Sequence, residues 1–443
     1  VTNLNNITLS DAKTNASIKN AGTLNIISGT NNLNSSVSGT GTTNIINGSK
    51  LVIGNGKSIT QSVININNGE LTLSDTGKIN ANLTIEQNGN ANLSASGITC
   101  AVTNNGNLNL RTGTLSDAVQ GSGLTNISGS VISNSAINQG INISGDLTIS
   151  ATNVGGSVSN GGSLTLNDGT LNNTVFGQGS TNISGAVISN AAINQGINIS
   201  GALTTNASNI GGIVTNANNL TLTGGTLSQT VNGTGSTSIT GSVLANNALN
   251  QEINISDSGE LTTNASNIGG IVTNANNLTL TGGTLSQTVN GTGSTSITGS
   301  VLANNALNQE INISDSGELT TNASNIGGIV TNANILILTG GTLAHSISGT
   351  GFACITGTVL GNAAMNQALD ITGSLTTDAD NIGATVSNSN DLTLTGGTLN
   401  QKVAGSGTTT VTGDVTNNET ISQDVTIRSE EHTSELQSRP HIS

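Results

Sequence analysis

Short runs in which apolar and polar residues alternate recur along the chain as far as residue 427. Examples are LNI at 24–26, LTL at 71–73 and INI at 253–255, and Gly or Asn residues bound most of these runs. Alternation with a period of two predicts strands that bury one face. Because strands of three to five residues are not stable alone, we expect each strand to pair with its equivalents elsewhere in the chain.

The sequence also repeats over longer distances. Residues 203–260 and 261–318 are identical at every position. Diverged copies of the same unit occupy residues 93–146, 147–202, 319–374 and 375–427. Repeats of fixed length are the signature of stacked architectures, in which each unit buries its apolar face against its neighbours.

A shorter period lies inside these units. Before residue 93, aliphatic residues recur about every 20 positions, at Ile26, Ile46, Ile66 and Ile85. In the long repeats the corresponding ladder includes Leu222, Ile239, Ile255 and Leu280. These spacings predict three turns of chain for each long repeat, with the aliphatic side chains stacked in an internal column.

The pattern therefore predicts an all-β protein, a single-stranded parallel β-helix or β-solenoid of about 23 turns of 16–25 residues. We expect residues 1–92 to form turns of about 20 residues and residues 93–427 to form six repeats of 54–58 residues. Gly and Asn supply the tight corners that such turns need, and stacked Asn side chains can hydrogen-bond along their own column. Helical repeats are excluded because LTLTGGTL alternates by two and contains Gly.

Composition agrees with this fold. The chain has 443 residues, 59 Gly, no Trp, no Tyr and two Phe, and charged residues make up 7% of it. A globular enzyme core filled with aromatic residues is therefore not expected. The chain is also unlike a disordered protein, which typically combines low hydrophobicity with high net charge or abundant Pro, because it contains one Pro.

The charge distribution argues against nucleic acid and membranes as partners. The formal net charge is −14, and no Lys or Arg occurs between residues 112 and 401. Binding to phosphates or to anionic lipid requires clustered basic groups. No stretch approaches the ~20 apolar residues of a membrane helix, so we expect no direct insertion of this fragment into a membrane.

Candidate catalytic residues are few and scattered. His345 is the one His before residue 428 and replaces Gln287 of the preceding repeat, which favours a polar turn over a catalytic role. Cys100 and Cys354 are far apart in sequence and form no redox or metal motif. We expect no catalytic residue, no cofactor-binding residue and no cofactor.

The acidic residues also favour a structural interpretation. Glu252, Asp257 and Glu260 fall in QEINISDSGEL, and Glu310, Asp315 and Glu318 repeat them. The DSGE segment predicts a solvated turn, with a weak Ca²⁺ site as the less favoured alternative. We therefore expect no metal site. Asp378 and Asp380 replace Asn and Ser of the preceding copy and are interpreted as surface positions.

The two Phe residues give little support for a sugar-binding groove. Phe352 replaces Ser236 of an equivalent repeat, and Phe176 is isolated in the sequence. Sugar-binding platforms normally use aromatic rings, which this chain almost lacks.

Both ends of the chain suggest a fragment. Val1 opens into polar sequence without a signal peptide or an initiating Met. Residues 428–443, RSEEHTSELQSRPHIS, break the composition of the chain, and RSEEHTSELQS resembles the in-frame translation of a sequencing adapter. We expect this tail to be non-native and give Glu431, His432 and His441 no functional role.

The repeats containing GGTL, NLTLTGGTL and INISG, with almost no Cys or aromatic residue, resemble the passenger regions of bacterial autotransporters and haemagglutinin-like adhesins. This resemblance implies secretion to the cell surface, attachment to the outer membrane in the full-length protein, and adhesion to host or neighbouring cells. The predicted function is a non-enzymatic surface rod, a stiff spacer or a multivalent adhesive surface. The alternatives are the shaft of a phage tail fibre or tailspike and, ranked lowest, a polysaccharide-acting enzyme on the same fold.

Overall fold

The computed structural model describes residues 1–428. The remaining residues of the expected non-native tail, with Glu431, His432 and His441, lie outside the described residues. Contacts divide the chain into two units, Val1–Ser238 with Asn246–Gln251 and Ile239–Ala245 with Glu252–Ser443. Each unit is a stack of parallel strands, so the chain is an all-β parallel β-solenoid, with about 25 coils counted over both units. The predicted fold is confirmed.

The first coils are built from three sets of strands that follow one another around the coil. Strands of one set pair in register at intervals of about 20 residues, as Leu51 of one coil pairs with Leu71 of the next. The sets are β1 (Thr2–Asn3), β4 (Ile18–Asn20) and β7 (Val37–Ser38); β2 (Asn6–Ser10), β5 (Thr23–Ser28), β8 (Thr42–Ile46), β10 (Ser58–Asn67) and β12 (Lys78–Ile85); and β3 (Lys13–Thr14), β6 (Thr30–Leu33), β9 (Lys50–Ile53), β11 (Glu70–Leu73) and β13 (Asn90–Leu93).

One rung of the predicted ladder is displaced by a residue. Ile45, fully buried, pairs with Ile26 and Ile66, whereas the expected Ile46 is only half-buried. Two consecutive Ile residues leave the choice open in the sequence, and the period of two settles it, because Thr43 and Ile45 share the inner face.

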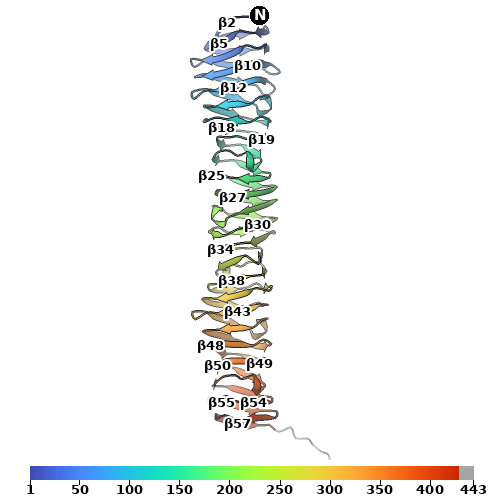
Figure 1. Ribbon diagram of the computed structural model, residues 1–443, viewed down its shortest axis with the longest axis vertical. Helices are drawn as coiled ribbons and strands as arrows, with labels where there is room; N and C mark the ends of the chain where they lie inside the picture. Colours follow the sequence, from blue (N-terminus) through green and yellow to red (C-terminus); the bar gives the residue numbers. More distant parts are fainter. Residues whose placement is uncertain (429–443) are drawn as a thin grey trace, which may run out of the picture. The chain divides into compact units, whose positions relative to one another are not determined.

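The identical copy at 261–318 shows how a long repeat is built. Its strands, visible in Figure 1 around β38 and β43, follow one another around successive coils. They are β36 (Glu260–Thr263), β37 (Val272–Asn274), β38 (Asn277–Leu280), β39 (Gly283–Leu285), β40 (Val289–Asn290), β41 (Ser294–Ile297), β42 (Ser300–Ala303) and β43 (Glu310–Ile313).

The next repeat follows the same plan with β44 (Glu318–Thr321), β45 (Val330–Asn332), β46 (Ile335–Leu338), β47 (Gly341–Leu343), β48 (Ile347–Ile355), β49 (Thr358–Gly361) and β50 (Met365–Ile371). A single 3₁₀ turn occurs in each long repeat. The six turns are Ala95–Gly97, Ala151–Asn153, Ala207–Asn209, Ala265–Asn267, Ala323–Asn325 and Ala379–Asn381. No α-helix occurs in residues 1–428.

A long repeat makes three and one-third coils instead of the expected three. Leu280 stacks on Ile297 and Ile297 on Ile313, but the next residue in that column is Asn332. Leu338, the equivalent of Leu280, stacks instead on Thr321. Each repeat is therefore rotated by one face relative to the repeat before it. The extra third of a coil in each of six repeats accounts for the rise from about 23 expected turns to about 25 coils.

The core consists of stacked aliphatic side chains, as predicted, but they form several columns, because Ile255 stacks on Asn274 and Leu280 stacks on Thr263. Ile239, Ile255 and Leu280 are 0%, 2% and 0% exposed, as the ladder requires. Where an Asn occupies a position in such a column, its side chain hydrogen-bonds to the backbone of the adjacent corner. The Nδ2 of Asn274 donates to the Ser294 carbonyl at 2.9 Å, and its Oδ1 accepts from the Asn276 amide at 3.1 Å. Buried polar groups are stable when they are paired in this way.

Outside the core, Asn side chains form the expected ladders. In the first unit Asn109 donates to Asn92 at 2.7 Å, Asn126 donates to Asn109 at 2.8 Å, and Asn142 donates to Asn126 at 3.1 Å. Each amide both donates and accepts, so these bonds run from coil to coil and reinforce the backbone pairing.

Candidate functional site

Two neighbouring hollows in the surface of the first unit adjoin one exposed aliphatic side chain, Ile188. It lies on β26 (Ala186–Ser189), between β24 (Gly169–Leu171) and β28 (Ala202–Thr205). Thr170, Ile188 and Thr204 occupy the same outward position on successive coils. Their inward neighbours Val187 and Leu203 are buried, so the alternation of the strand places Ile188 outside, where it is 49% exposed.

A hollow lies on each side of Ile188. One, of about 220 Å³, extends toward the corner and is lined by Ser189, Asn190, Thr204, Thr205, Asn206, Asn209 and Thr223 as well as Ile188. The other, of about 320 Å³, is lined by Gly169, Thr170, Ala186, Val187, Ile188, Ala202 and Thr204. The two hollows share Ile188 and Thr204, so they form one shallow surface with a central apolar ridge.

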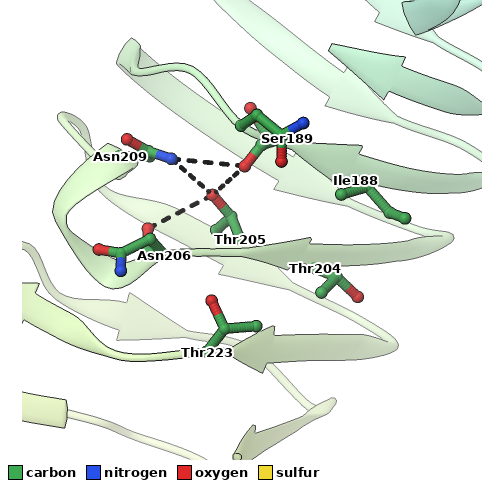
Figure 2. Close-up of a pocket in the computed structure, with 8 residues that line it drawn as sticks. Ile188, Ser189, Thr204, Thr205, Asn206, Asn209 and Thr223 are labelled. Carbon is green, nitrogen blue, oxygen red and sulfur yellow. Dashed lines mark hydrogen bonds between the residues drawn. The ribbon is translucent and has the colours of Figure 1, made fainter. Parts of the chain in front are cut away.

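Hydrogen bonds fix the wall of the corner hollow. Figure 2 shows Thr205 at their centre: its Oγ1 donates to the Ser189 carbonyl at 2.8 Å, and Asn209 donates to the same carbonyl at 3.4 Å. The Oδ1 of Asn206 accepts from the Ser208 amide at 3.0 Å, which caps the 3₁₀ turn Ala207–Asn209. The wall is therefore held by its own bonds.

Every side chain that lines the two hollows is uncharged. None of them is a carboxylate, imidazole or thiol, so proton transfer and nucleophilic attack have no evident agent there. Hydroxyl and amide groups beside an aliphatic ridge suit a neutral polar ligand that also presents an apolar face.

The ridge recurs once in each repeat but on changing faces. Within the second unit, Leu244, Leu302 and Leu360 occupy the position of Ile188 and are 41–42% exposed. Leu244 stacks on Thr262, Leu302 on Thr320 and Leu360 on Thr376, in three separate columns. The one-third coil added by each repeat therefore directs successive ridges to different sides.

The DSGE segment singled out in the sequence is an exposed corner, as predicted, whereas Glu252 lies outside it at the start of β35 (Glu252–Ile255). Asp257 and Ser258 are exposed in the turn between Ile255 and Glu260. Glu260 accepts a hydrogen bond from Ser242 at 2.6 Å, and in the second copy Glu318 accepts from Ser300 at 3.4 Å. Among residues 1–428 no three His, Cys, Asp or Glu side chains are close enough together to hold a metal ion.

His345 and the Asp pair have structural surroundings. His345 is half-buried in the bend between β47 and β48. Asp378 accepts from the Asp380 amide at 3.0 Å and caps a 3₁₀ turn, while Asp380 accepts from the Thr398 amide at 2.8 Å. They take the places of Asn322 and Ser324, which make the equivalent bonds.

Both cysteines are free and partly buried. Burial raises the pKa of the Cys100 thiol, and burial with the nearby Asp370 and Glu318 carboxylates raises the pKa of the Cys354 thiol. Each thiol is therefore protonated near neutral pH. A protonated thiol is a weak nucleophile.

The residues that the sequence analysis missed are buried amides. The Nε2 of Gln251 donates to the hydroxyl of Thr237, and the Nδ2 of Asn216 donates to the Oε1 of Gln251 at 3.3 Å. The second unit repeats this triad with Asn274, Thr295 and Gln309. The spacing of 14 residues between Thr and Gln in successive copies was the available signal.

No protein-family model, curated protein or solved structure matches the chain. No helix within residues 1–428 is long and apolar enough to cross a membrane. Fold and surface chemistry are thus the basis for a functional proposal.

Proposed function

We propose that the chain is part of a non-enzymatic extracellular adhesin, the passenger region of a protein attached to the bacterial outer membrane. It acts as a stiff spacer and as a multivalent surface for molecules on host or neighbouring cells. We expect no cofactor, no nucleic-acid partner and no insertion of this segment into a membrane.

The main observation in support is an exposed aliphatic residue that recurs at one outward position in four successive repeats. Ile188, Leu244, Leu302 and Leu360 each pair with an outward Thr of the next coil, and the hollows beside Ile188 contain no titratable group. Such a surface can make many weak contacts with neutral polar molecules. Several weak contacts on one chain gain strength through effective concentration.

Continuous strand pairing supports the spacer role. Within the second unit the column from Leu302 continues through Thr320, Ile337, Cys354 and Asp370 without losing register. Bending such a stack requires several parallel ladders to open together, so each unit resists bending.

The test is adhesion of beads coated with the full chain to cultured epithelial cells and to bacterial cells under flow. We expect more beads to be retained than with an albumin coating. When the coating density is lowered, retention should fall more steeply than the density, because binding is multivalent. Retention equal to the albumin control on both cell types would contradict the adhesin proposal.

Two measurements distinguish the alternatives. Sedimentation equilibrium of the full chain reports its oligomeric state, and a stable trimer would favour the shaft of a phage fibre. Release of reducing ends from a panel of bacterial and plant polysaccharides would favour an enzyme. We expect neither a trimer nor polysaccharide cleavage.

A further inference from the structure

One repeat of the second unit carries a surface that its neighbour lacks. Residues 319–374 follow the sequence of 261–318 closely, yet on the strands that correspond to β38, β41 and β43 five outward polar residues are replaced by apolar or less polar ones. Each change is given as the residue of 261–318 followed by its equivalent in 319–374: Asn277 to Ile335, Thr279 to Ile337, Ser294 to Phe352, Ser296 to Cys354 and Glu310 to Ala368.

The structure brings these five replacements together. Ile335 of β46 pairs with Phe352 of β48, and Ile337 pairs with Cys354. Phe352 in turn pairs with Ala368 of β50. We call Ile335, Ile337, Phe352, Cys354 and Ala368 the apolar patch.

The apolar patch faces outward. Leu336, Ala353 and Leu369, which alternate with its members along the three strands, are at most 2% exposed and point into the coil. Phe352 is 39% exposed, and Ile335, Ile337 and Cys354 are partly exposed.

Folding does not require this surface to be apolar. The same backbone positions carry Asn277, Thr279, Ser294 and Ser296 in the preceding repeat, and that repeat forms the same strands in the same register. Contiguous exposed apolar groups reduce solubility and often mark an interaction site. A partner that covers the apolar patch accounts for its presence.

Carboxylates lie at both ends of the apolar patch. Glu318 pairs with Ile335 on the coil before it, and Asp370 pairs with Cys354 on its last coil. Both carboxylates contribute to the raised pKa of the Cys354 thiol, so their negative field reaches the middle of the surface. No Lys or Arg occurs between residues 112 and 401 to offset it.

We propose that the apolar patch docks an extended segment of a partner protein in which an apolar side chain stands between two basic ones. Glu318 and Asp370 are three coils apart, about 14 Å along the stack at the usual strand spacing. Residues i and i+4 of an extended chain are about 13 Å apart and project to the same side. A Lys-x-Phe-x-Lys segment therefore places its ring on Phe352 and Ile337 and its two ammonium groups near the two carboxylates.

A second copy of this chain fits the surface less well. Two apolar patches brought face to face would also bring together Glu318 and Asp370 from both copies, in a chain whose net charge is −14. Like charges in apposition oppose association. The proposal stands whether or not the protein is an adhesin, because it rests on the apolar patch and on the carboxylates of Glu318 and Asp370 at its ends.

The test measures binding of two labelled peptides to the full chain by fluorescence anisotropy, with reductant present to keep Cys354 reduced. The peptides are Lys-Val-Phe-Val-Lys and Glu-Val-Phe-Val-Glu, each blocked at both ends. The fourfold variant Ile335→Asn, Ile337→Thr, Phe352→Ser and Cys354→Ser restores the residues of the preceding repeat, so it is expected to fold. Phe176→Ser, which removes the other exposed ring, is the matched control.

We expect the Lys peptide to bind the parent chain and the Phe176→Ser variant equally well. It should bind the fourfold variant at least tenfold more weakly, and its binding to the parent chain should weaken as the salt concentration rises. The Glu peptide should not bind. Equal binding of the Lys peptide to parent and fourfold variant, or no saturable binding at all, would overturn the proposal. Sedimentation velocity covers the remaining case: a parent dimer that the fourfold variant loses would assign the apolar patch to a second copy.

Discussion

Asn332 donates its Nδ2 hydrogen to the Oε1 of Gln367, 3.2 Å away, in the interior of the second unit. The same Gln367 leaves its Nε2 without a partner, although it is 2% exposed. In the preceding repeat Gln309 donates from this atom to the hydroxyl of Thr295. Ala353 stands where that hydroxyl would be.

Ala353→Thr should therefore stabilise the coils around β48 and β50. A buried donor without a partner costs roughly 1–3 kcal/mol, and a restored hydrogen bond contributes about 1 kcal/mol net. Native-state hydrogen exchange should slow about fivefold for amides of these two strands. Thr295→Ala is the reciprocal control and should speed exchange by a similar factor in β41 and β43. Unchanged exchange in both variants would mean that solvent or rearrangement satisfies the Gln side chains.

Gly361 and Met365 form a compensating pair in the same repeat. The preceding repeat has Ala303 and Leu307 at these positions. A Cβ on Gly361 would lie 3.0 Å from Met365 Cε.

Gly361→Ala should consequently destabilise the protein by about 1 kcal/mol, the lower end of the cost of overpacking, because the thioether methyl can shift. The double variant Gly361→Ala with Met365→Leu should recover that loss. A double-mutant cycle on thermal unfolding measures the coupling. Additive effects of the two substitutions would show that the two positions do not compensate each other.

Gly283 combines a left-handed backbone with a close contact. Its φ is +90°, and a Cβ added there would clash with the Oδ1 of Asn264. That oxygen is fixed because it accepts from the Ser266 amide at 3.0 Å. Gly283→Ala should lower the free energy of unfolding by more than about 2 kcal/mol, since it adds a clash to a strained φ.

The control for this prediction is Gly48→Ala in the first unit. Gly48 has φ +74° but no atom within 4 Å of an added Cβ, so only the conformational cost applies. Chemical denaturation should show the smaller loss for Gly48→Ala. Equal losses would mean that the contact with Asn264 contributes nothing.

Glu70 gives the first unit a small dependence on pH. Its pKa is lowered mainly by the hydrogen bond from Lys50, at 2.8 Å, with further bonds from Thr72 and Asn92. A lowered carboxyl pKa stabilises the folded state above the ordinary carboxyl range, and this contribution is lost as pH falls through the lowered pKa.

Glu70→Gln should therefore lower the melting temperature at pH 7 and have little effect in acid, where the carboxyl is protonated. Because both side chains are about a third exposed, solvent screening keeps the difference at pH 7 below about 1 kcal/mol. Differential scanning calorimetry at the two pH values compares the parent with the variant. A deficit that is as large in acid as at pH 7 would assign the effect to packing.

The period of two and the repeat lengths were enough to predict the fold. They were not enough to predict which buried residues stack on one another along the ladder. Ile143 stacks on Asn160, which is fully buried and satisfied by bonds to Ser180 and Gly162. A search for aliphatic residues passes over such an Asn and continues to Leu166, which belongs to the column of Ile149. The missing third of a coil was hidden by a polar residue in a core position.

The apolar patch and the ridge at Ile188 depend on which residues stack on one another, so they were harder to predict from the sequence. The substitutions at Ile335 and Phe352 are 17 residues apart and look unrelated until the register pairs them. The ridge at Ile188 is likewise one apolar residue among many in the sequence, and the inward position of its neighbours distinguishes it.

A change in the number of repeats would alter the direction in which a surface faces as well as the length of the stack. An additional copy of 261–318 inserted before residue 319 would turn Phe352 and its neighbours by about 120° relative to the preceding coils of the same unit, because each repeat advances one face. Three additional copies would return them to the original side. The number of copies would then determine the side of the stack on which this binding surface lies. Recombination between the identical segments would change that side.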